Sequence, residues 1–201
     1  MLKLPYSFYQ ENDVVDLSIQ LLGKKLCTYL DGKLTTGIIV ETEAYNGVTD
    51  KASHAYGNRF TARTSTMYEE GGVTYVYLCY GIHYLLNVVT GAKNTPQAVL
   101  IRGIEPLEGV DMMLLRRKML QLAPRITAGP GALAKALGID KNLNAKDLLG
   151  NEIWIENNGI YYNEDEIVSS PRVGVDYAEE HALLPWRFYI KGNKFVSKPN
   201  S

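Results

Sequence analysis

The sequence predicts an α+β fold with a mostly antiparallel β-sheet, organised as one domain over residues 1–201. β-rich segments cluster in the first half of the chain, and most helical patterns follow later. Glycine-containing turns separate neighbouring β-rich segments, as they do in hairpins. No repeat or linker divides the chain, and its 46% apolar and 21% charged residues are those of an ordinary globular protein.

The first expected element is a helix that begins after Asn12 and ends before Gly23. Asn12 is a favourable N-cap residue, the first turn is acidic, and leucines follow as an apolar stripe. Glycine just beyond the stripe is a typical stop signal. We therefore expect a short amphipathic helix that flanks the sheet.

Strands are expected wherever β-branched, aromatic and other apolar residues gather between turn signals. Five such segments follow the first helix: 25–31, 34–45, 73–80, 82–90 and 98–104. Asp31-Gly32 separates the first two, and Gly81 separates the next two, so two hairpins are predicted.

Two helices and two short strands complete the expected order. One helix is predicted to begin at Pro106, because the apolar residues after it recur at helical spacing. A second helix is expected after Gly129-Pro130-Gly131 and before Gly138, with short strands at 153–155 and 187–190.

Length and composition narrow the class of protein. The chain has no apolar run of about 18 residues, so no membrane span is expected, and its amino terminus lacks the pattern of a secretory signal. Cys27 and Cys79 lie far apart and outside any C-x-x-C motif, so they do not make a zinc site by themselves, and a cytoplasmic location is expected. The common NTPase, dinucleotide and hydrolase motifs do not occur.

The net charge of −1 argues against a nucleic-acid partner, but the distribution of charge weakens that argument. Residues 51–147 hold 12 basic and 7 acidic side chains, whereas residues 148–180 hold 1 basic and 8 acidic ones. One face of the molecule could therefore be basic while the whole is near neutral. Ordinary solvated surfaces explain these counts at least as well.

An apolar strand that ends in two glutamates is the first segment with chemical potential. Glu41, Glu43 and Tyr45 alternate, so their side chains point to one side of a strand. A carboxylate on a rigid apolar strand suits a general base, because burial raises its pKa. Read alone, the fragment fits an exposed edge or a pair of structural salt bridges slightly better.

Segment 74–84 contains four tyrosines. Tyr75 and Tyr77 share one face, and Tyr80-Gly81-Ile82 falls where the chain turns back. Bulky side chains on an exposed tip usually contact a partner, and a wedge of Tyr80 and Ile82 could fill a gap between unstacked bases. A tyrosine-rich sheet face of ordinary β-propensity is the simpler explanation for this segment by itself.

His54 lies in a loop-like stretch, Ala52-Ser53-His54-Ala55-Tyr56. An isolated histidine is more often structural than catalytic, and no companion residues form a metal-ligand pattern with it. No metal ligands are therefore predicted.

Together, these segments closely resemble the alkyladenine (3-methyladenine) DNA glycosylase family. The resemblance keeps its order and spacing from about Leu21 to Ser197. The matching blocks are Glu41-Thr42-Glu43-Ala44-Tyr45, Ser53-His54, the tyrosine segment 75–87, 99–109 (Val-Leu-Ile-Arg-Gly-Ile-Glu-Pro-Leu-Glu-Gly), Gly129-Pro130-Gly131, 172–175 and 185–189. The probability that so many blocks agree by chance in the same order is very small, although any one block is weak evidence.

The resemblance implies a monofunctional glycosylase that removes alkylated or deaminated purines from double-stranded DNA as the first step of base excision repair. Glu43 would activate the water that attacks the anomeric carbon, and Arg102 would help to hold that water and the flipped nucleotide's phosphate. No metal, cofactor or obligate protein partner is implied, and we expect a monomer. The implied fold is a curved mixed body with a DNA-intercalating β-hairpin, similar to the carboxy-terminal domain of methionyl-tRNA formyltransferase.

The resemblance also implies a base pocket and an intercalating tip. Tyr45, His54 and Tyr77 would stack on and hydrogen-bond the extruded base, and Asn87 would press against purines that carry a 2-amino group. Tyr80 would fill the space that the base leaves. An aromatic pocket suits alkylated purines, because they are electron-poor and often cationic, and cation–π attraction then favours them.

Two departures from the family pattern predict weak non-specific DNA binding. Ala132 stands where relatives often carry a lysine, although Lys135 lies one helical turn further on, and the loop 57–63 is less basic than in many relatives. The preferred lesion stays open, because hypoxanthine, ethenoadenine, 3-methyladenine and 7-methylguanine differ by one or two polar contacts.

Two other classes of function remain to be weighed. A nucleic-acid-binding module without activity would share the fold but would have no use for Glu43 beside Tyr45 and His54. A small-molecule hydrolase could use the same acid. Release of free purine from alkylated duplex DNA separates both from a glycosylase.

Overall fold

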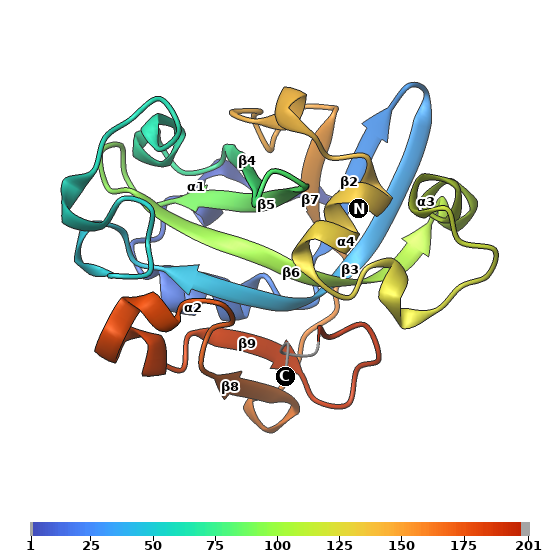
Figure 1. Ribbon diagram of the computed structural model, residues 1–201. Helices are drawn as coiled ribbons and strands as arrows, with labels where there is room; N and C mark the ends of the chain where they lie inside the picture. Colours follow the sequence, from blue (N-terminus) through green and yellow to red (C-terminus); the bar gives the residue numbers. More distant parts are fainter. Residues whose placement is uncertain (1, 198–201) are drawn as a thin grey trace.

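The computed structural model describes residues 2–197, and its strands form one curled antiparallel sheet (Figure 1). The order is β1-β7-β2-β3-β6-β5-β4, with β9 paired to β3 and β8 to β9. Every strand pairing in this part of the chain is antiparallel, which confirms the predicted α+β class. The strands are β1 (Leu2–Lys3), β2 (Lys25–Leu30), β3 (Lys33–Tyr45), β4 (Thr74–Cys79), β5 (His83–Thr90), β6 (Gln97–Glu108), β7 (Ile153–Asn157), β8 (Ile167–Ser170) and β9 (Arg187–Ile190).

Strand β3 is the centre of the curl. It pairs with β6 along most of its length, with β2 over its first half and with β9 at Glu41, Thr42 and Glu43. The register against β6 shifts at Thr36/Gly37 and on both sides of Glu41. Because each such irregularity bends and twists a strand, β3 leaves β2 and reaches β9 within 13 residues.

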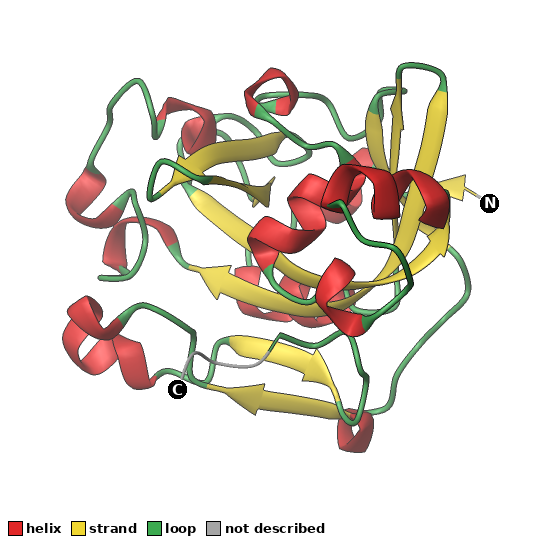
Figure 2. Ribbon diagram, turned by 45° about the vertical axis from the view of Figure 1, so that its right-hand side comes forward, coloured by secondary structure: helices red, strands yellow, loops and turns green. Residues whose placement is uncertain are grey.

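Four α-helices within residues 2–197 cover the sheet. They are α1 (Tyr6–Tyr9), α2 (Val14–Gln20), α3 (Val110–Arg117) and α4 (Pro130–Leu137). Helix α2 packs on β3 and β6 from behind, whereas α4 lies in front of β5 and β6 with α3 beside it (Figure 2). Short 3₁₀ turns occupy the loops: η1 (Gly47–Thr49), η2 (Tyr56–Asn58), η3 (Ser65–Tyr68), η4 (Pro124–Ile126), η5 (Lys141–Leu143), η6 (Glu164–Glu166) and η7 (Asp176–Leu183).

Both predicted hairpins are confirmed. Asp31 and Gly32 join β2 to β3 with φ of 52° and 71°. Tyr80, Gly81 and Ile82 join β4 to β5, and φ is 50° at Tyr80 and 71° at Gly81. Two consecutive positive φ values are those of a type I′ turn, whose twist matches that of the flanking strands. Tyr80 adopts this conformation although it is not a glycine.

The predicted start of a helix at Pro106 is wrong. Strand β6 continues through Pro106 to Glu108, because β3 supplies pairing partners up to that point. The chain then turns at Gly109, where φ is +72°, and α3 begins at Val110. A Cβ at Gly109 would lie 2.2 Å from the Leu34 carbonyl oxygen, so this turn depends on glycine.

Smaller differences concern element ends. The N-cap of α2 is Asp13 rather than Asn12, and its carboxylate accepts from the N–H groups of Val15 and Asp16. The short elements β1, α1 and β8 lie outside the sequence prediction, since segments of two to four residues carry little periodicity. In the described part of the chain, no helix is long and apolar enough to cross a membrane.

Candidate active site

Glu43 is fully buried on β3, and each of its carboxylate oxygens has a partner. Oε2 accepts a hydrogen bond from the Tyr45 hydroxyl at 2.8 Å, and Oε1 accepts one from the Val173 N–H at 2.8 Å. Arg102 Nη1 lies 3.3 Å from Oε1. The alternation of β3 places Glu43 and Tyr45 on one face, as the sequence predicts. Neighbouring β6 brings Arg102 to Glu43.

Burial raises the pKa of Glu43, against the opposing effects of the Arg102 cation, the Val173 N–H and the Tyr45 hydroxyl. Burial and the nearby Glu43 also raise the pKa of Tyr45, so its hydroxyl stays protonated and donates. The arrangement therefore holds a buried carboxyl group whose carboxylate form is more basic than that of a solvated glutamate.

Glu41 belongs to a separate, fully paired cluster beneath Glu43. Its Oε1 lies 3.0 Å from Arg102 Nε and 2.7 Å from Arg187 Nε. Ser197 contributes its backbone N–H to Oε2 and its hydroxyl to Oε1. Glu41 is therefore held by two arginines and Ser197, and Arg102 pairs with both glutamates.

A cavity of about 470 Å³ opens between the β4–β5 hairpin, the start of α4 and the chain around Val173. Tyr45, Tyr77 and Arg102 line it, together with the hairpin tip and residues 128–132. Glu43 lies directly behind this wall, in contact with three of its members: Tyr45, Arg102 and Val173. The volume is within the usual range for pockets that take a small ligand.

A second, narrow recess of about 40 Å³ adjoins this cavity and shares Tyr45 and Tyr77 with it. His54 and Asn87, which the sequence places in a base pocket, line the recess. Asn87 is almost fully buried, and its Nδ2 donates to the Tyr75 carbonyl at 3.1 Å, which fixes the orientation of the amide. The structure thus brings all the sequence-predicted pocket residues to one place.

His54 is held in one tautomer by two neighbours. Its Nδ1 lies 2.9 Å from the Tyr75 hydroxyl, and its Nε2 lies 3.2 Å from Nη2 of Arg63. Because a guanidinium only donates, Nε2 is the acceptor and Nδ1 carries the proton. Burial, followed by Arg63 and Arg59, lowers the pKa of His54 to about 4, so the ring is neutral near pH 7.

The tyrosine rings have cationic neighbours. The Arg63 guanidinium carbon lies 4.7 Å from the centre of the Tyr77 ring, and that of Arg172 lies 4.9 Å from the centre of the Tyr45 ring. Arg172 is also paired with Asp50, where both side chains are fully buried. These distances are those of cation–π contacts.

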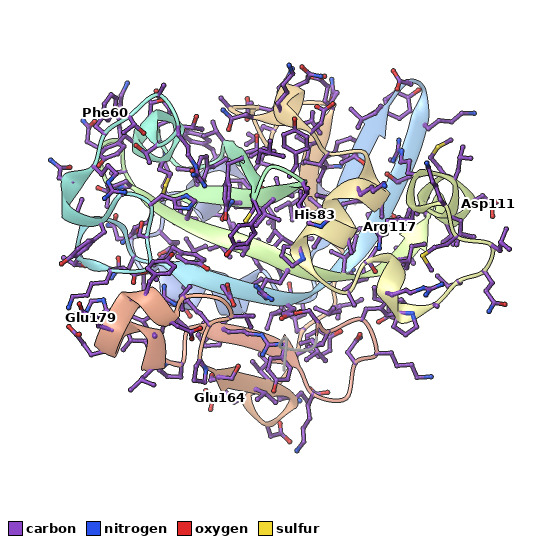
Figure 3. The ribbon with its side chains drawn as sticks, in the orientation of Figure 1. Phe60, His83, Asp111, Arg117, Glu164 and Glu179 are labelled. Atoms are coloured by element: carbon purple, nitrogen blue, oxygen red, sulfur yellow. The ribbon has the colours of Figure 1, made fainter. Side chains whose placement is uncertain are left out.

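The hairpin tip presents apolar side chains to solvent. Tyr80 is 89% exposed and Ile82 is 71% exposed. Tyr80 and His83 line the cavity, so the hairpin tip lies beside it. Figure 3 shows His83 between the hairpin and α4, where a Cβ on Gly131 would approach its ring to 2.8 Å. The tip is therefore exposed, while its base is packed tightly against the helix.

The sequence does not assign a function to four residues that contribute to the site. Arg172 meets Asp50 across 122 positions and Ser197 meets Glu41 across 156, so no local pattern links them. Val173 acts through its backbone N–H, which residue type does not reveal. Arg63 lies in a loop whose sequence gives no sign of its stacking on Tyr77. Within residues 2–197, no three His, Cys, Asp or Glu side chains gather as a metal site requires.

The sequence places this fold in a known enzyme family: the chain belongs to the methylpurine-DNA glycosylase (MPG) family, whose model matches residues 7–194. Among curated proteins, a "Putative 3-methyladenine DNA glycosylase" of Chlamydia felis is 47% identical over 193 residues, which cover 95% of this chain and 97% of the relative. Proteins with the same name from Alkaliphilus oremlandii and Clostridium novyi are 42% and 45% identical, each over 98% of this chain and 100% of the relative.

Proposed function

We propose that this protein is a monofunctional DNA glycosylase that flips an alkylated or deaminated purine out of duplex DNA and hydrolyses its N-glycosidic bond with a water activated by Glu43. The observation that carries the proposal is a fully buried carboxylate behind the wall of a tyrosine-lined cavity. Family membership supports the same chemistry.

Glu43 acts as the general base. The water's oxygen forms a bond to the anomeric carbon while its proton passes to Glu43, and the electron pair of the broken C–N bond leaves with the base. Positive charge develops on the sugar in the transition state, and the ionised carboxylate stabilises it. Entry of a nucleotide must expose an edge of Glu43, which the cavity wall of Tyr45 and Arg102 covers in the free protein.

The recess and cavity supply the base-binding surface. Tyr45 and Tyr77 offer ring faces for stacking, and His54 and Asn87 offer polar edges. Because its Nδ2 is bound to the Tyr75 carbonyl, Asn87 is a rigid obstacle to a 2-amino group. Such a group would have to displace a buried amide, so normal guanine is disfavoured.

The exposed tip and the start of α4 supply the DNA contacts. Tyr80 and Ile82 form the wedge that occupies the place of the extruded base. The N-terminus of α4, at residues 129–132, lines the cavity, and the N–H groups of Gly131 and Ala132 at this helix end suit a phosphate. Ala132 contributes no charge there, and Lys135 is exposed on the same helix.

Arg102 links the two carboxylates and borders the cavity. In this position its charge opposes the effect of burial on the Glu43 pKa and favours the carboxylate form, and it lies where it can contact the nucleotide's phosphate. The described residues that line the cavity include no lysine, which supports a water nucleophile over a Schiff base and thus excision without strand cleavage.

The proposal is tested by measuring the rate of base excision by the Glu43→Gln variant. A duplex with one hypoxanthine is incubated with the protein, and released base and alkali-labile sites are quantified under single-turnover conditions. We expect loss of at least about 10²-fold in rate with lesion binding retained, while Glu69→Gln, an exposed control, stays at wild-type activity. A fully active Glu43→Gln protein would overturn the role of Glu43.

The same assay separates the two other classes of function. Tight binding of lesion DNA by the wild-type protein without base release would indicate a binding module. Hydrolysis of free nucleosides but not of duplex DNA would indicate a small-molecule hydrolase. We expect a monomer that requires neither a protein partner nor a membrane. In size-exclusion chromatography, the protein should elute as one chain, and its complex with DNA should contain one chain.

A further inference from the structure

Two tyrosine rings that line the cavity already contact a cation on one side. Arg172 lies against Tyr45, and Arg63 lies against Tyr77, while neither arginine lines the cavity or the recess in the described structure. A ring face attracts a cation through the ring's quadrupole. Because each ring already interacts with an arginine, its attraction for a second cation is weaker.

The two arginines differ in how their charge is balanced. Arg172 is buried and paired with Asp50, whose carboxylate compensates it within hydrogen-bond distance. Arg63 is exposed, and no carboxylate of residues 2–197 forms an ion pair with it. Its positive charge therefore acts on the base site without a local counter-charge.

Arg63 also occupies the acceptor nitrogen of the His54 ring, which lines the recess. Its Nη2 donates to Nε2 of His54, and the His54 proton on Nδ1 points to the Tyr75 hydroxyl. A bound base thus meets a neutral histidine whose acceptor is already in use, next to a ring that already carries a cation.

These contacts have opposite consequences for the two kinds of lesion base. A cationic base, such as 7-methylguanine, gains less attraction from Tyr77 and is repelled by the uncompensated guanidinium. A neutral base, such as hypoxanthine, loses nothing of its stacking. The tyrosines alone would predict that the pocket prefers cationic bases. The arginine contacts reduce this preference.

We propose that Arg63 is a specificity-determining residue that shifts excision toward neutral lesion bases and away from cationic ones, through its stacking on Tyr77 and its bond to His54. This inference rests on the proposed function, since it concerns the base that the same site accepts. Arg63 acts through Tyr77 and His54, since it does not itself line the cavity or the recess in the described structure.

The experiment compares single-turnover excision of 7-methylguanine and of hypoxanthine from otherwise identical duplexes. The quantity of interest is the ratio of the two rates in each variant divided by that ratio in the wild type, so the different intrinsic labilities of the two bases cancel. In Arg63→Gln we expect this ratio to rise about fivefold in favour of 7-methylguanine, the size of an exposed cation–π contact.

Two further variants separate ring contact from bulk charge. Arg63→Lys keeps a cation that can also lie over the Tyr77 ring, so its ratio stays within about twofold of the wild type. Arg59→Gln removes an equal charge from the same exposed loop, and Arg59 makes no cation–π contact with a tyrosine ring in the described structure. We expect it to weaken binding of all DNA alike and to leave the ratio unchanged.

An unchanged or lower ratio in Arg63→Gln would overturn the inference, and so would an equal rise in Arg59→Gln. Either result leaves the proposed function intact as long as the wild type releases both bases. A wild-type protein that releases neither base would overturn the proposed function, and the inference with it. Thermal unfolding of each variant confirms that the exposed substitutions leave the fold in place.

Discussion

Ser197 donates to both carboxylate oxygens of Glu41: its backbone N–H reaches Oε2 at 2.6 Å and its hydroxyl reaches Oε1 at 2.7 Å. The Ser197 hydroxyl in turn accepts from Arg102 Nη2 at 3.2 Å. A residue 156 positions along the chain thus completes the shell of a buried acid, and the same residue orients the arginine that touches Glu43.

Ser197→Ala should lower both stability and excision. The loss leaves polar groups of Glu41 and Arg102 without a buried partner, which costs about 1–3 kcal/mol in unfolding free energy. Excision should fall severalfold, because Arg102 is less well held. Urea unfolding and single-turnover kinetics measure the two effects, and Ser169→Ala, an exposed serine on β8, is the control. Equal stability of the Ser197→Ala and Ser169→Ala proteins would contradict the role of Ser197.

Glu41→Gln should damage the fold more than Glu43→Gln does. Removing the Glu41 charge leaves Arg187 and one side of Arg102 buried without a counter-charge, and breaking such a pair typically costs about 3–5 kcal/mol. Glu43→Gln instead relieves a carboxylate whose burial raises its pKa, so its stability should equal or exceed that of the wild type. Chemical unfolding of the two variants side by side checks the order, and the reverse order would refute this division of labour.

The excision rate should rise with pH and then level off. A general base works only when it is ionised, and burial places the pKa of Glu43 above its ordinary value, so the rate is lost as pH falls through that raised pKa. His54, with a pKa of about 4, stays neutral over most of this range. Single-turnover rates on hypoxanthine between about pH 5 and pH 8 test this expectation. A flat profile would argue against a carboxylate base.

Tyr80→Ala should weaken lesion binding and base flipping without affecting stability. Its side chain is 89% exposed, so the free energy of unfolding should change by less than about 0.5 kcal/mol. Fluorescence of a 2-aminopurine placed beside the lesion reports the flipped population, which should fall. Tyr29→Ala, an exposed tyrosine on β2, serves as the control. If flipping and affinity both match the control, the wedge is another residue.

The parts of the fold that were predictable are those fixed by local chemistry. The turns at Asp31-Gly32 and Tyr80-Gly81 set the two hairpins, and both are present where glycine indicated them. The segment after Pro106 has helical spacing, yet pairing with β3 keeps it extended, and that pairing is a tertiary contact. Local pattern has no information on partners so distant in sequence.

The site follows the same division. Glu43 and Tyr45 converge because strand alternation puts them on one face, and this is legible in the sequence. The contact of Arg102 with both glutamates depends on β6 lying beside β3. The contributions of Arg172 and Val173 depend on a loop that returns from the far end of the chain, so only the folded structure reveals them.

The close fit of His83 over Gly131 has a mechanical consequence. Under the proposed function, a wedge driven into stacked base pairs is pushed back by the duplex with an equal force. His83 would transmit part of that force from the β4–β5 tip to the backbone of α4, which packs against β5 and β6. If Tyr80 and Ile82 are the wedge, this contact would limit bending of the hairpin, so more of the work of insertion would go into distorting the DNA.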